Sequence, residues 1–90
     1  MQTLTKQIDD NLVIETVKKK VSRLGCKQPA TLWAEFVQQG NFTICCLCLE
    51  LNNEEKIGLG VSKRSVHDNP DPEIGMRIAC SRACENAFSS

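Results

Sequence analysis

The sequence predicts a two-layer α+β domain in the order helix, strand, strand, strand, helix (α-β-β-β-α), with a three-stranded antiparallel sheet and both helices on one face. Three observations predict it. The two outer segments repeat small or apolar residues at helical spacing, the three inner segments alternate apolar residues, and the turns between the strands are short. Ninety residues allow one modest core, so we expect residues 1–90 to form a single domain.

The first helix is expected to start after Asp9 and Asp10 and to end at Gly25. Between these limits apolar residues recur at steps of three and four: Leu12, Val13, Val17, Val21 and Leu24. Three lysines, 18–20, and Arg23 occupy the last turns, where cations suit the negative end of the helix dipole. We interpret this charge run as a solvated face.

Three strands are predicted at residues 31–39, 42–51 and 56–63, with turns at Gly40-Asn41 and Asn52-Asn53. The central strand is apolar on both faces. One face carries Cys45, Leu47, Leu49 and Leu51, and the other carries Phe42, Ile44, Cys46 and Cys48. We therefore expect a partner subunit to cover the second face and the chain to form a homo-oligomer through it.

The side chains of the third strand alternate between large and small. We expect the large ones to point inward, namely Ile57, Leu59 and Val61, and the small ones outward, namely Gly58, Gly60 and Ser62. The last helix is expected to begin at Pro72, with Asp71 as its cap, and to reach about Phe88. One face of this helix consists mostly of small residues: Met76, Ala79, Cys80, Ala83, Cys84 and Ala87.

Charge and hydropathy narrow the classes of function. Eleven Lys and Arg balance eleven Asp and Glu, which argues against a surface built for long polyanions. The longest apolar run, residues 44–49, is far shorter than the roughly 20 residues of a spanning helix. No leader pattern opens the chain, so we expect a cytoplasmic protein that does not enter membranes. No catalytic motif is present, and we expect a binding protein without turnover or cofactor.

The six cysteines are interpreted as reduced thiols that serve as small core residues. Zinc is the alternative, with Cys46 and Cys48 on a strand and Cys80 and Cys84 one helical turn apart as its ligands. Their spacing differs from the tight pairs of structural zinc sites. Cysteine catalysis is disfavoured, because the one histidine, His67, lies in a polar turn away from the apolar cysteine segments.

Two resemblances bear on function. The element order resembles that of the double-stranded-RNA-binding domain. The C-terminal sequence motif is similar to that of small bacterial and phage proteins of unknown function. The motif comprises Gly58-Leu59-Gly60-Val61-Ser62-Lys63-Arg64, Asp68, Pro72-Glu73-Ile74-Gly75, Ile78-Ala79 and Arg82-Ala83, about a third of the chain. It also resembles phage anti-defence proteins of the Thoeris type, sponges that sequester cyclic nucleotide-like immune signals. The resemblance implies a phage protein acting in a bacterial host.

A ligand site is expected where the third strand ends and the last helix passes. Its polar residues are Lys63, Arg64, His67, Asn69, Arg77 and Arg82, which suit a small anionic, nucleotide-like ligand. The alternative role for Arg77 and Arg82 is pairing with Glu73 and Glu85 on the helix surface.

Three functions remain open at this point: a nucleotide-ligand sponge, a double-stranded-RNA-binding module, and a protein-interaction module that inhibits a host factor through the apolar sheet face. For RNA, the start of the last helix is acidic where RNA-binding members of that fold carry lysines.

Overall fold

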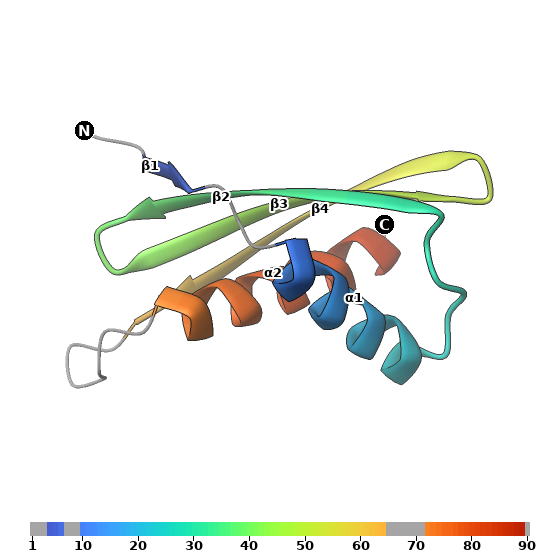
Figure 1. The fold of residues 1–90 in the computed structure, drawn as a ribbon, viewed down its shortest axis with the longest axis horizontal. Coiled ribbons are helices and arrows are strands. Elements are labelled where there is room, and N and C mark those ends of the chain that lie inside the picture. The colour runs from blue at the N-terminus through green and yellow to red at the C-terminus, as the bar shows by residue number, and fades with distance from the viewer. Residues whose placement is uncertain (1–3, 7–9, 65–71, 90) are drawn as a thin grey trace.

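The computed structural model describes residues 4–6, 10–64 and 72–89. They form β1 (Leu4–Lys6), α1 (Asp10–Leu24), β2 (Thr31–Gln39), β3 (Phe42–Leu51), β4 (Glu54–Lys63) and α2 (Pro72–Ser89). The predicted α-β-β-β-α order is confirmed, and both helices lie on the same side of the sheet (Figure 1). The structure adds β1, a three-residue strand that the sequence analysis missed.

The sheet is antiparallel throughout, in the order β1-β2-β3-β4. Two-residue turns join β2 to β3 and β3 to β4, so Gln39 pairs with Phe42 and Leu51 with Glu54. Asn52 and Asn53 both have left-handed backbones, with φ of 54° and 64°, as the mirror-image turns of tight hairpins require. These turns fix the register, and the register decides which side chains face the helices.

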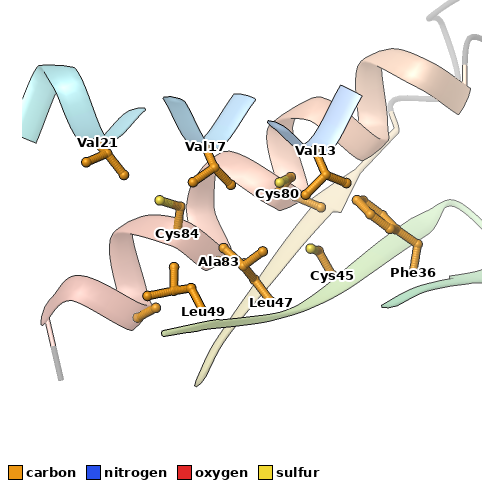
Figure 2. Close-up of a cluster of buried hydrophobic side chains, with 12 residues drawn as sticks. Val13, Val17, Val21, Phe36, Cys45, Leu47, Leu49, Cys80, Ala83 and Cys84 are labelled. Atoms are coloured by element: carbon orange, nitrogen blue, oxygen red, sulfur yellow. The ribbon is translucent and has the colours of Figure 1, made fainter. Parts of the chain in front are cut away.

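The core lies between β3, α2 and α1 (Figure 2). Cys45, Leu47 and Leu49 of β3 point towards the helices and are at most 1% exposed. The small-residue face predicted for α2 is confirmed, because Ala79, Cys80, Ala83, Cys84 and Ala87 are fully buried. The valines of α1 close the far side of this core: Val13, Val17 and Val21. α1 rests mainly on α2 and makes little contact with β2.

The orientation predicted for β4 was wrong. Gly58, Gly60 and Ser62 face α2 and are buried, whereas the large side chains between them are exposed on the opposite side. The physical reason is the close approach of α2. A Cβ atom at Gly60 would overlap the backbone of Ala79 and Ala83, so only glycine fits beneath the helix. Ser62 seals this contact, since its Oγ donates to the Gly75 carbonyl at 2.8 Å.

No helix in the described part of the chain is long and apolar enough to cross a membrane.

Candidate functional site

The sheet face opposite the helices, called the open face here, is the candidate functional surface. No element among residues 4–6, 10–64 and 72–89 covers it (Figure 1). Five large apolar side chains on it are between 43% and 58% exposed: Trp33, Phe42, Ile57, Leu59 and Val61. Half-buried Val37, Ile44 and Cys46 fill the space between them.

The strand register places these residues in rows across the sheet. Trp33 is opposite Cys48, which is opposite Ile57. Two residues further along β4, Leu59 is opposite Cys46, and Val61 follows opposite Ile44. Since neighbouring strands lie about 4.8 Å apart, the rows join into one contiguous apolar patch.

Charged groups lie at the two ends of this patch. Glu50 and Glu55 are directly opposite each other at the end near the β3–β4 turn. Like charges in this arrangement destabilise a sheet. Each carboxylate accepts one hydrogen bond, Glu50 from the Thr31 hydroxyl at 3.2 Å and Glu55 from the Cys48 thiol at 2.9 Å. Neither of these hydrogen-bond donors is a cation.

The other end of the open face is basic. Lys63 is opposite Phe42, and its Nζ lies 5.6 Å from the centre of the Phe42 ring, within the range of a cation–π contact. The fourth charged residue on this face is Glu35, opposite Cys46 on β2. Among the described residues, the open face therefore carries three carboxylates and one ammonium group.

The open face is shallow. Its hollow of about 330 Å³ lies towards the acidic end and is lined by Trp33, Cys48, Glu50 and Glu55 among others. The hydrogen bond to Glu55, together with burial, raises the pKa of the Cys48 thiol to about 11. At neutral pH this thiol is protonated and acts as a hydrogen-bond donor, which makes it a poor nucleophile.

Three of the predicted anion-binding residues lie around the end of β4. Arg64 is adjacent to Lys63, its backbone N–H donates to the Asn41 carbonyl at 2.8 Å, and its guanidinium donates to the Asn41 side chain at 3.4 Å. Arg82 reaches across from α2 and donates to the Val61 carbonyl at 2.7 Å. Among the described residues, none of these three cations forms an ion pair with a carboxylate.

Arg77 lies apart from this group. It forms an ion pair with Glu73, one turn earlier on α2, at 2.8 Å. Arg82 is five positions after Arg77, so the two point in directions about 140° apart around the helix axis. Glu85, the partner considered for Arg82, instead pairs with Lys20 of α1 at 2.9 Å. The other two predicted residues, His67 and Asn69, lie outside the described residues, as does the predicted helix cap, Asp71.

The four cysteines considered for zinc do not come together. Cys46 and Cys48 lie on the open face, whereas Cys80 and Cys84 lie in the core on the other side of the sheet (Figure 2). Within the described ranges, no three His, Cys, Asp or Glu side chains converge as metal ligands. The hydrogen bond to Cys80 and burial raise the pKa of the Cys45 thiol, and burial raises that of Cys84 to about 11. These thiols pack as small core residues.

Sequence reasoning found half of the open face and missed the rest. Phe42, Ile44, Cys46 and Cys48 were predicted to share it, and the structure confirms this. Ile57, Leu59 and Val61 were placed in the core instead. The signal that could have placed them correctly is the pair Gly58 and Gly60, because a small-residue helix packs best on a strand that also presents small residues.

No family model, no curated protein and no solved structure matches the chain. The resemblances drawn from the sequence therefore remain expectations.

Proposed function

We propose that the protein is a non-enzymatic binding protein that acts through the open face of its sheet, and that the molecule bound there is a protein. The observation that carries this is the contiguous row of exposed Ile57, Leu59 and Val61 beside Trp33 and Phe42. Aromatic side chains present roughly 150–250 Å² each and aliphatic ones somewhat less, so these five half-exposed side chains amount to about 500 Å² at most. The largest apolar patch on a typical soluble monomer is about 300–600 Å² and often has a function.

The shape and charge of the open face favour a protein over other ligands. Small molecules bind in concave sites that bury most of their surface, whereas this face is a sheet with a shallow hollow. Nucleic acids need cations along the surface, whereas the described residues of this face include three carboxylates, Glu35, Glu50 and Glu55, and one ammonium group, Lys63. A second apolar protein surface is the partner that this combination suits.

Photo-crosslinking in cells tests the proposal. A benzoylphenylalanine at Ile57 should give an adduct of defined mass with a protein, either a second copy or another chain. The same group at Ser22, which is exposed on α1, is the matched control and should give none. Leu59→Glu should remove the Ile57 adduct while the variant stays folded. An adduct that is equally strong from both positions, or none from Ile57, would contradict the proposal.

A second candidate is the binding of a small anionic, nucleotide-like ligand at the end of β4, as in a phage protein that sequesters an immune signal in the bacterial cytoplasm. What favours it is the group Lys63, Arg64 and Arg82, which lack carboxylate partners among the described residues. Calorimetry with cyclic nucleotides and cyclic ADP-ribose isomers tests it, with Arg77→Ala as the control for Arg82→Ala. Equal affinity in the wild type and in Arg82→Ala would exclude Arg82 from such a site.

A further inference from the structure

We propose that the partner on the open face is a second copy of this chain, packed sheet to sheet, with the strands of the two copies antiparallel. This inference rests on the proposed function, because it uses the same face. It adds the identity of the partner and the symmetry of the complex. Three features carry it: the area of the patch, the closed edge of β4, and the order of charges along β4.

The area fits one half of a small dimer interface. The exposed apolar side chains contribute about 500 Å² at most, and the polar residues at both ends of the rows enlarge the face further. A stable interface of standard size buries about 800 Å² on each partner. Two sheets pack with their strands within about 30° of each other and their inner side chains interdigitated, which the exposed Leu59 and its neighbours allow.

Association by the free edge of β4 is hindered. Arg82 donates to the Val61 carbonyl at 2.7 Å, and Asn86 donates to the Leu59 carbonyl at 2.6 Å. Side chains of α2 thus occupy backbone acceptors that another strand would need in order to extend the sheet. The edge of β4 is occupied by side chains of α2, whereas its open face is exposed. A second copy therefore buries more apolar surface by packing on the face than by pairing with the edge.

The order of charges along β4 indicates the orientation of the second copy. Glu55, Leu59 and Lys63 lie on the open face at equal steps of four residues. A two-fold axis through Leu59, perpendicular to the strands and in the plane of the interface, places Lys63 of each copy against Glu55 of the other. An axis along the strands would instead bring the Glu50 and Glu55 ends of both copies together.

The antiparallel arrangement also offsets the repulsion between Glu50 and Glu55 within each copy. Glu50 and Glu55 are opposite each other and neither forms an ion pair among the described residues, and Lys63 of the second copy would supply a cation. Leu59 then packs on its own symmetry mate. Glu35 lies in the same row of the sheet as Leu59, two strands and about 10 Å away, so this axis also brings the two copies of Glu35 towards each other on the β2 side of the patch. The two Lys63–Glu55 pairs must outweigh this like-charge contact.

Sedimentation equilibrium over a wide range of concentration tests the inference. We expect the wild type to reach twice its chain mass of 10.0 kDa and Leu59→Glu to stay monomeric. Glu55→Lys and Lys63→Glu should each weaken the dimer by roughly tenfold, since each removes two symmetric ion pairs. The double variant with both substitutions should regain the wild-type affinity. Glu54→Lys is the control, because Glu54 lies one residue away and on the helix side of the sheet.

A measurement on the wild type covers the case in which a variant does not fold. Cys46 lies in the middle of the open face and Cys26 is exposed beyond α1, so alkylation of Cys46 should slow as the protein concentration rises while that of Cys26 stays constant. A wild type that stays monomeric, a dimer that survives Leu59→Glu, or a double variant that fails to regain affinity overturns the inference. A monomer whose Ile57 crosslinks to a different protein would leave the proposed function standing.

Discussion

Replacing Gly60 with alanine is expected to lift α2 off the sheet. A Cβ at this position would overlap the carbonyl oxygen of Ala79 and the backbone N of Ala83, and would lie 3.0 Å from the Ala83 Cα. These are backbone atoms of a helix, so no side-chain rotation relieves the overlap. The helix must move as a unit, and its contacts with β4 are the most extensive between any two elements of the fold.

The loss of stability in Gly60→Ala depends on how far the overlapping backbone of α2 can move. Overpacking a core costs about 1–3 kcal/mol, and we expect about 3 kcal/mol here because the overlap is with backbone. A chain of this length has a free energy of unfolding of roughly 5–14 kcal/mol, so the substitution removes a large fraction of it. At about 4–8 °C per kcal/mol for a domain of this size, Tm should fall by roughly 12–24 °C.

Thermal and urea unfolding followed by circular dichroism would measure this change. Gly40→Ala is the control: Gly40 has a left-handed backbone with φ of 58° but open space around it, so that variant should lose only about 1–2 kcal/mol of backbone strain. Ala83→Gly should fail to rescue Gly60→Ala, because the overlap is with backbone. Alanine that does not clash with a neighbour stabilises by about 0.4–1 kcal/mol over glycine. A Gly60→Ala protein as stable as the wild type would therefore refute the close seating of α2.

Other outcomes follow from the same structure. Arg82→Ala should lower the free energy of unfolding by about 0.5–1.5 kcal/mol, measured by urea unfolding, because it removes the hydrogen bond to the Val61 carbonyl; no loss of stability would count against that contact. Burial raises the pKa of Cys84 from its ordinary 9.0 to about 11 in the folded protein, so stability is complete below pH 9 and falls as pH rises through 11. Because the pKa values of Cys45 and Cys48 are also raised, denaturation should show a loss across that range in both proteins, and the loss in Cys84→Ala should be smaller than in the wild type by about 2–3 kcal/mol. An equal loss in the two proteins would contradict this assignment. Chelator should leave the circular dichroism unchanged, whereas unfolding with release of one zinc per chain would reassign the thiols as ligands.

The bounds of most elements could be predicted from local signals. The Asn52-Asn53 turn and the alternation around it fixed β3 and the start of the hairpin to within two residues. The small-residue stripe of α2 likewise predicted its buried face. β1 could not be predicted, because a strand of three residues is too short to show a pattern and its pairing with β2 is a tertiary choice.

The face of β4 was mispredicted for a physical reason. Alternation identifies two faces but does not say which one is buried, and the rule that large apolar residues point inward decided the prediction. In the structure the fit between Gly60 and α2 outweighs the exposure of Leu59. The predicted anion site included both Arg77 and Arg82 because they are close in sequence. They lie on different sides of α2, so only Arg82 is near the end of β4.

The packing of α1 on α2 bears on the order in which the elements fold. β3 and β4 are joined by a two-residue turn, and α2 follows β4 along the chain and covers it, so the contacts of the C-terminal half close over short loops. Val17 and the other buried valines of α1 pack mainly on α2, which lies at the far end of the chain, so these contacts close a long loop. We therefore expect nucleation in the C-terminal half, with late docking of α1. In kinetic terms, Val17→Ala should accelerate unfolding far more than it slows folding, whereas truncations in the β4–α2 contact should slow folding itself.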